Sequence, residues 1–219
     1  MTYILGLNFN HADSSAAILK NGIVLAAVEE ERFNRIKHTL SFPKQSINYC
    51  LKKCGISINE VDYISINKNF YSNIFKKIHY SFLHPNFFVS KIMNLKKKNK
   101  VGIHELIKKN FPEYKNKKIF YVDHHLSHIA SSVYMSGFKN SIVMSIDGFG
   151  DFASTAWGTF DNNNIKIIDR IYFPHSLGIF YQSMTQFLGF NKYGDEYKVM
   201  GLAPYGNPKY VDLIKKHLI

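Results

Sequence analysis

Short apolar runs separated by turn residues dominate the first third of the chain, and their length is typical of β-strands. In this third the runs expected to form strands are residues 3–9, 15–19, 23–28 and 61–67, and a fifth strand is expected further on at residues 119–122. Lys20-Asn21-Gly22 lies between the second and third runs and is a strong hairpin signal. Pro43 and Gly55 delimit a helix between the third and fourth strands, because proline favours the first helical position and glycine ends a helix. The pattern predicts a β-β-β-α unit followed by further strands.

The same order of elements recurs in the second half of the chain. There the expected strands and helix are residues 142–146, 154–160, 165–172 and 176–188. In both copies a polar or glycine-rich loop, Asn8-Phe9-Asn10 or Asp147-Gly148-Phe149-Gly150, precedes a strand of small residues. We therefore predict an α/β fold made of two β-β-β-α units that face a shared cleft.

The second copy is expected to be incomplete, because it lacks counterparts of the strands at 61–67 and 119–122. We divide the chain into residues 1–140, which include an insertion at 68–118, and residues 141–219, which begin a second subdomain. The expectation from the repeat is that a symmetric fold would need more residues than these.

The net charge of +12 is concentrated in one segment. Residues 68–118 hold thirteen lysines against Glu105 and Glu113, so the rest of the chain is almost neutral. A basic segment of this kind can attract nucleic acid or another anionic ligand. The alternative is a solvated lysine-rich insertion. We favour this alternative because the arginine forks typical of specific phosphate recognition are absent from the segment.

The chain shows neither a membrane span nor the features of a secretion signal. No apolar run approaches the roughly 20 residues that cross a bilayer, and the first residues lack a basic region and cleavage site. Cys50 and Cys54 lie four residues apart on one predicted helix, which is not the C-x-x-C spacing of redox pairs. Two buried thiols in a reducing cytoplasm are the simpler interpretation.

Candidate chemistry is concentrated in residues 119–151. A predicted helix there presents His124 and His128 on one face, so both imidazoles can bind one metal ion. Asp147 closes the next strand and is the nearest candidate for a third ligand. A metalloprotease HExxH motif is excluded, because His125 stands where that motif needs glutamate.

Three further stretches have both a chemical and a purely structural interpretation. Asp147–Asp151 is either a phosphate-binding loop or a tight turn between strands. His11, in the matching loop of the first copy, is either a general base or part of a polar turn. Lys198 follows an acidic pair and either neutralises a phosphate or lies in an ordinary loop. The charged run at 29–38 is expected to form surface ion pairs of small energetic value.

Five strings in fixed order carry a family resemblance: ILGLNFNHADSSAAILKNGIVLAAVEEERFNRIKH, DHHLSHIASS, SIDGFGD, HSLGIFYQSMTQFLGF and KVMGLAPYG. Together they run from Tyr3 to about Pro208, and they resemble the O-carbamoyltransferases of nodulation and antibiotic biosynthesis. The resemblance implies an actin/Hsp70/sugar-kinase-like (ASKHA, ribonuclease H-like) fold, related to the universal tRNA threonylcarbamoyl-transfer protein. Ala12 departs from the family pattern, which usually has glycine or no residue there.

The resemblance implies carbamoyl transfer. In this family, carbamoyl phosphate and ATP form a carbamoyl adenylate, which a hydroxyl group of a small-molecule or sugar acceptor then attacks. The resemblance implies that His124, His128 and Asp147 bind Fe²⁺ or a similar divalent metal. It also implies that His11 is the base that takes the proton from the acceptor hydroxyl. Residues similarly assigned to the adenylate are Asn8, Gly148, Gly150, Lys198 (also catalytic) and Gly201. A metal that polarises the carbonyl, beside N–H and lysine groups that hold the phosphate, suits this chemistry.

Family members also contain a further aspartate ligand and a second domain that makes the adenylate. Neither is expected in these 219 residues, so the chain alone is not expected to be competent. The resemblance therefore implies a truncated chain, a split-gene product or a chain that needs a partner. Two alternatives stay open: a tRNA- or nucleic-acid-binding relative that uses residues 68–118, and a non-catalytic remnant. No motif identifies the acceptor alcohol.

Overall fold

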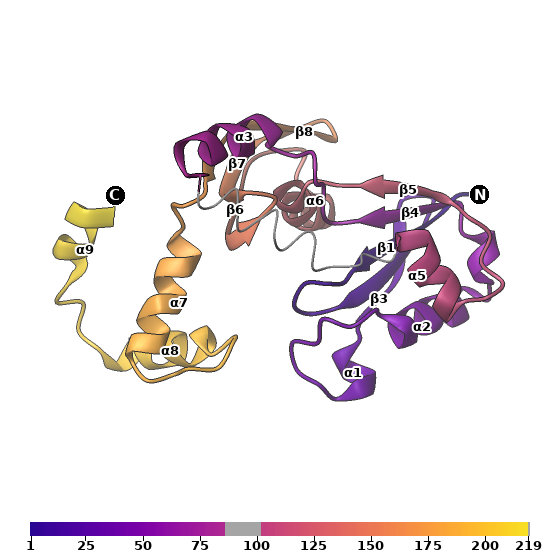
Figure 1. Ribbon diagram of the computed structural model, residues 1–219, viewed down its shortest axis with the longest axis horizontal. Coiled ribbons are helices and arrows are strands. Elements are labelled where there is room, and N and C mark those ends of the chain that lie inside the picture. Colours follow the sequence, from indigo (N-terminus) through magenta and orange to yellow (C-terminus); the bar gives the residue numbers. More distant parts are fainter. Residues whose placement is uncertain (86–101, 219) are drawn as a thin grey trace.

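The computed structural model describes residues 1–85 and 102–218, so part of the basic insertion at 68–118 lies outside the described residues. Two sheets lie on either side of helix α6 (His124–Ser136) (Figure 1). The first sheet has five strands in the order β3-β2-β1-β4-β5. These strands are β1 (Tyr3–Asn8), β2 (Ser15–Lys20), β3 (Ile23–Glu29), β4 (Tyr63–Ile66) and β5 (Lys118–Tyr121). Strand β1 is antiparallel to β2 and parallel to β4, as expected when a helix connects the third and fourth strands.

Alternation of side chains along the central strands builds the core of the first sheet. Leu5 and Ile18 point to one face and are inaccessible to solvent. Two helices cover this face, α2 (Lys44–Cys54) and α5 (Ile103–Asn110). They contribute Ile47 and Ile107 to the same buried cluster. Each such side chain stabilises the fold by about 1.5–3 kcal/mol through burial.

The opposite face of the first sheet carries small side chains and faces α6. Gly6, Ala17 and Ser65 line this face. Ala130 and Ser131 of α6 line the other wall of the same groove, whose volume is about 870 Å³. Small side chains on both walls therefore leave an open groove between the sheet and the helix.

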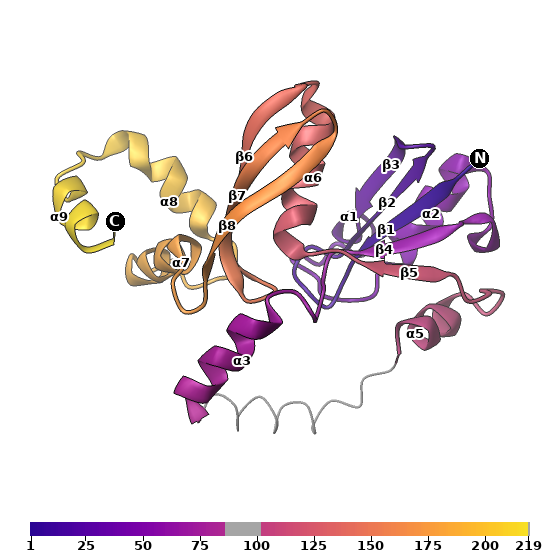
Figure 2. The same cartoon turned by 90° about the horizontal axis from the view of Figure 1, so that it is seen from above.

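The second sheet contains the antiparallel strands β6 (Asn140–Gly150), β7 (Ala153–Asp161) and β8 (Asn164–Tyr172). Ile129 and Val133 of α6 pack against Val143, Ala156 and Phe160 of this sheet. Helix α6 thus follows β5 in the chain but belongs to the core of the second sheet (Figure 2). Residues on both sides of position 140 contribute to this core. The domain boundary expected at that position stays a prediction.

The remaining described helices are α1 (Glu31–Asn34), η1 (Ile58–Glu60), α3 (Ile74–Leu83), α7 (Leu177–Phe187), α8 (Glu196–Leu202), η2 (Ala203–Tyr205) and α9 (Val211–Leu218). Helices α7, α8 and α9 extend from the second sheet on the side away from the first sheet (Figures 1 and 2). No described helix combines the length and apolar character that crossing a bilayer requires.

The α/β fold with two β-β-β-α units is confirmed, and the second sheet has three strands in the part of the chain that is described. Residues 195–206 form α8 and η2, so the ordinary loop that was one of the two interpretations for Lys198 is wrong. Gly201 and Pro204 suggested a loop, but Gly201 lies inside α8 and Pro204 lies in the first turn of η2. Proline is tolerated in a first turn, where its missing N–H has no partner to lose.

The two cysteines are free thiols in different environments. Cys50 is buried, and burial together with neighbouring Cys54 raises the pKa of its thiol to about 11. A thiol with this pKa stays protonated and unreactive near neutral pH. Cys54 is only half-buried, so the expectation of two buried thiols is wrong for that residue.

Glu30 departs from the surface role expected for the charged run at 29–38. Its side chain is buried, and its carboxylate accepts hydrogen bonds from the Gln45 and Ser46 amides at 3.1 and 2.8 Å. The Ser46 hydroxyl donates a third bond at 2.8 Å. These groups begin α2, where unpaired amides and the helix dipole favour a carboxylate. Glu29 behaves as expected, in an exposed ion pair of 2.7 Å with Arg32.

Replacing Glu30 with glutamine should lower the free energy of unfolding by about 2 kcal/mol, because charge-assisted hydrogen bonds to buried donors are lost. The neighbouring change Glu29→Gln is the matched control and should cost less than about 0.5 kcal/mol. Urea denaturation followed by circular dichroism measures both values. Equal destabilisation by the two changes would contradict the capping role of Glu30.

Candidate metal centre

Helix α6 is fixed at its first turn by Asp123, which is buried. The Asp123 carboxylate accepts a hydrogen bond from the Leu126 amide and one from Arg170 of β8, each 3.0 Å long. Burial opposes ionisation of Asp123, but the Leu126 amide and the Arg170 guanidinium outweigh it and hold the carboxyl pKa below its usual value. The start of α6 is therefore tied to the second sheet by a charged cap.

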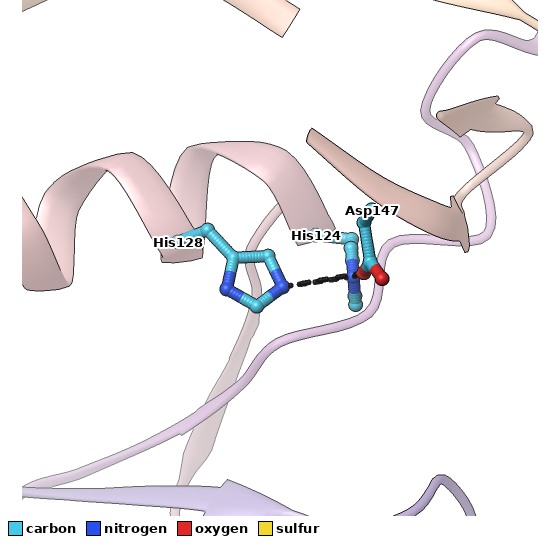
Figure 3. A group of neighbouring side chains, drawn as sticks. All are labelled: His124, His128 and Asp147. Atoms are coloured by element: carbon cyan, nitrogen blue, oxygen red, sulfur yellow. Dashed lines mark hydrogen bonds and ion pairs between the residues drawn. The ribbon is translucent and has the colours of Figure 1, made fainter. Parts of the chain in front are cut away.

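Three potential metal ligands converge where α6 begins and β6 ends (Figure 3). The His124 Nε2 atom lies 2.7 Å from the Asp147 Oδ2 atom, and the His128 Nε2 atom lies 3.4 Å from the same oxygen. The two Nε2 atoms are 3.1 Å apart. The Asp147 pKa is held well below its usual value, mainly by the hydrogen bonds from His124 and His128. Asp147 is thus a carboxylate between two imidazoles.

The donor set and its spacing suit one divalent metal ion. Metal–ligand bonds to histidine nitrogen and carboxylate oxygen are about 2.0–2.2 Å long, which places neighbouring ligand atoms roughly 3 Å apart. The three atoms lie within 4.8 Å of one another, close to that requirement. The three residues could therefore hold one metal ion, and metal binding itself stays a prediction.

The end of strand β6 is shaped around the His124 ring. The pairing of β6 with β7 is irregular between Ile146 and Gly150, which turns Asp147 toward α6. A Cβ atom on Gly150 would lie 1.9 Å from the His124 ring, so only glycine fits there. Asp151, at the following turn, accepts a hydrogen bond from the His124 backbone amide at 2.9 Å. Strand β6 therefore positions both the ring and the backbone of His124.

The family profile described as "Carbamoyltransferase N-terminus" matches residues 3–219. This chain belongs to the carbamoyltransferase family. The uncharacterized protein sll1178 of Synechocystis sp. is 41% identical over 232 residues, which cover 100% of this chain and 37% of that protein. The nodulation protein NolNO of Sinorhizobium fredii is 37% identical over 199 residues, which cover 90% of this chain and 28% of that protein.

This carbamoyltransferase-family chain therefore spans about a third of the length of the curated relatives that it matches. Among solved structures, the ROK hexokinase from Thermus thermophilus superposes with a TM-score of 0.47 at 10% identity. That superposition covers 97% of this chain and 72% of the hexokinase chain. The strand order described above, rather than this superposition, identifies the fold.

Among the other residues to which the family resemblance gives a role in carbamoyl transfer, His11 lies beside the candidate metal centre. Its ring centroid is 5.5 Å from that of His124. Asn8 holds the loop that carries His11, since its amide donates to the Ala12 and Asp13 carbonyl oxygens at 3.1 and 2.9 Å. Asn8 is thus already engaged in positioning, and its role as a cofactor contact stays a prediction.

The glycines and the lysine expected to contact an adenylate have structural partners of their own. The Gly148 amide donates to the Asp147 carboxylate at 2.6 Å, and Gly150 pairs with Ala153 in the sheet. Lys198 forms an ion pair of 2.7 Å with Asp195 at the start of α8. Among the described residues, no hydrogen bond or ion pair joins Lys198 or Gly201 to His124, His128 or Asp147. Their binding roles stay predictions.

Two residues of the carbamoyltransferase string HSLGIF belong to the site but had no assigned role. The Ser176 hydroxyl caps α7 and donates to the Gly148 carbonyl oxygen at 2.7 Å. A Cβ atom on Gly178 would lie 2.5 Å from the Asp147 carbonyl oxygen. Helix α7 therefore packs directly on the backbone that carries Asp147. In the sequence, the two small residues Ser176 and Gly178 at the start of a predicted helix are the signal that could have indicated this close packing.

His125 is structural. It is fully buried, and its Nε2 and Nδ1 atoms lie 3.0 Å from the Ala153 carbonyl oxygen and 2.9 Å from the Ser145 hydroxyl. The carbonyl can only accept, so Nε2 carries the proton. Burial lowers the His125 pKa and favours this neutral form. The residue locks α6 to the second sheet next to the candidate metal ligands, with its ring centroid 5.4 Å from that of His124.

Replacing Gly150 with alanine should weaken divalent-metal binding about 10- to 100-fold, because the added methyl group displaces the His124 ring. Gly148→Ala is the matched control. A Cβ there makes only an ordinary contact of 3.6 Å with Ile179, so metal affinity should stay within about twofold. Isothermal titration with Mn²⁺ measures both constants. Wild-type affinity in Gly150→Ala would show that the His124 ring position does not matter for the metal.

Proposed function

We propose that the chain forms the metal-binding part of an enzyme that transfers a carbamoyl group to a hydroxyl of a small-molecule or sugar acceptor. The donor in this proposal is a carbamoyl adenylate made from carbamoyl phosphate and ATP. The observation that carries the proposal is the convergence of His124, His128 and Asp147 in a chain of the carbamoyltransferase family. A divalent metal held there, Fe²⁺ by the family resemblance, would polarise the carbamoyl carbonyl.

His11 is the proposed base for the acceptor hydroxyl. Its Nδ1 atom faces the Ala12 carbonyl oxygen at 3.4 Å, which leaves Nε2 as the proton acceptor. In the proposed step, the hydroxyl oxygen bonds to the carbamoyl carbon while its proton passes to His11. The bond from that carbon to the phosphate oxygen breaks, and AMP leaves with the electron pair. An exposed imidazole beside the candidate metal centre suits this role.

The adenylate contacts proposed by resemblance are Asn8, Gly148, Gly150, Lys198 and Gly201. Lys198 would have to exchange its ion pair with Asp195 for the phosphate. Because Lys198 is partly exposed, the exchange has a small energetic cost.

Other parts of the active enzyme belong to the proposal as well. Since the chain spans about a third of its relatives, we infer that the remaining part of a longer polypeptide, or a partner chain, supplies the adenylate-forming domain. The same part would supply a further carboxylate ligand. A reducing cytoplasm is the proposed location, in keeping with two free thiols.

Titration of the chain with Fe²⁺ under anaerobic conditions, or with Mn²⁺, tests the proposal. We expect one ion per wild-type chain and at least about tenfold weaker binding by His128→Ala. His11→Asn should keep the metal affinity of the wild type, because His11 is proposed as the base for the acceptor hydroxyl and not as a metal ligand. His217→Ala is the control for a histidine in α9, remote from the site.

A second titration, with a non-hydrolysable ATP analogue, tests the nucleotide part of the proposal in the metal-loaded chain. Binding by the wild type would support it. A wild-type chain that binds neither metal nor the analogue would overturn the proposed function.

A further inference from the structure

Helix α3 carries an apolar stripe on its outer side. Phe75, Ile78 and Phe82 are three and four residues apart, so they lie on one face of the helix. These residues are 84%, 50% and 83% exposed to solvent. Figure 2 shows α3 projecting from one side of the molecule. We call the three residues the α3 stripe.

The opposite side of α3 is anchored to the end of the second sheet. The Tyr80 ring packs edge-on against the Phe173 ring, with ring centroids 5.1 Å apart. Asn73, the residue before the helix, donates a hydrogen bond from its side-chain amide to the Asp151 carbonyl oxygen at 2.9 Å. Because these contacts use the other side of the helix, they hold the α3 stripe facing outward.

The sequence around the stripe is uniformly basic. Helix α3 contains Lys76 and Lys77 and no acidic residue. Between Asp62 and Glu105 the chain has eight lysines and no aspartate, glutamate or arginine. Lysine side chains can lie along apolar surface while their ammonium groups reach outward to anions. The stripe is therefore an apolar surface bordered by positive charge.

This combination suits an anionic lipid surface better than the other occupants. A second copy of the chain would bring two basic segments together, and like charges repel. Nucleic acid is commonly bound by arginine forks and by rings that stack on bases, but this segment lacks arginine and Ile78 has no ring. A lipid surface accepts aromatic and aliphatic side chains alike and attracts lysine through its phosphate groups. Ten residues are too few to cross a bilayer, so α3 would lie in its surface.

We propose that α3 docks the chain on a membrane surface that contains anionic lipid. Phe75, Ile78 and Phe82 enter between the lipid headgroups, and Lys76, one residue from Phe75, reaches the phosphate groups beside the stripe. The helix axis lies parallel to the membrane. This interaction surface goes beyond the proposed function and does not depend on carbamoyl transfer.

Flotation with vesicles of phosphatidylcholine and phosphatidylglycerol in equal parts tests the docking. The wild-type chain should bind these vesicles and not vesicles of phosphatidylcholine alone. Binding should weaken when the salt concentration rises from about 0.1 to about 0.5 M, because salt screens the attraction to the lipid charges.

A charge placed in the α3 stripe should abolish most of this binding. Phe75→Glu should weaken it at least about tenfold, because a carboxylate loses the apolar contact and is repelled by the lipid phosphates. Phe187→Glu is the matched control, since Phe187 is 81% exposed and ends another helix, α7. That variant should stay within about twofold of the wild type.

The lysine contribution has its own control. Lys76→Gln should weaken vesicle binding about fivefold, the effect of one lysine near an anionic surface. Lys53→Gln removes an exposed lysine from α2 and should change the binding less than about twofold. Equal losses in the two variants would show that binding follows net charge alone, which would overturn the role of α3.

The remaining outcomes decide between occupants. A wild-type chain that does not bind the anionic vesicles, or that binds them no better than Phe75→Glu does, would overturn the proposal. A tRNA gel shift that Phe75→Glu removes, without vesicle binding, would assign the stripe to nucleic acid instead. A dimer in analytical ultracentrifugation that Phe75→Glu dissociates, again without vesicle binding, would assign the stripe to a second copy of the chain.

Discussion

The contact between His124 and Asp147 is the constraint on which the rest of the site depends. It joins α6, which begins at the edge of the first sheet, to β6, which begins the second. The contact requires glycine at position 150, since any side chain there would displace the His124 ring. It also requires α7 to pack closely on the backbone of Asp147, which Gly178 permits. The three candidate metal ligands are thus positioned by packing between elements.

Much of the fold could be predicted from the sequence, because its signals are local. Alternating apolar runs, the Asn21-Gly22 turn and the Ser176 cap all specify elements through their immediate neighbours. The histidine pair could be predicted for the same reason, since a four-residue spacing places two side chains on one helix face. Assigning Asp147 as the third ligand used only the order of elements along the chain.

The rest depends on contacts between distant segments, for which the sequence has no local signal. Gly150 looked like a phosphate-binding glycine, but its Cα faces the His124 ring. Glu30 looked like one of several surface acids until the fold placed α2 against its carboxylate. Helix α3 exposes an apolar face only because Tyr80 on its other side packs against Phe173. Such roles follow from tertiary packing, which overrides what a single stretch suggests.

The central claim is that His124, His128 and Asp147 together bind one divalent metal ion. X-ray absorption spectroscopy of the chain loaded with one equivalent of Fe²⁺ under anaerobic conditions tests it most directly, because it reports the metal's own ligands. The account predicts two imidazole ligands at about 2.0–2.2 Å, with oxygen atoms completing the shell. A spectrum with no imidazole, or one that is unchanged in His128→Ala, would contradict it.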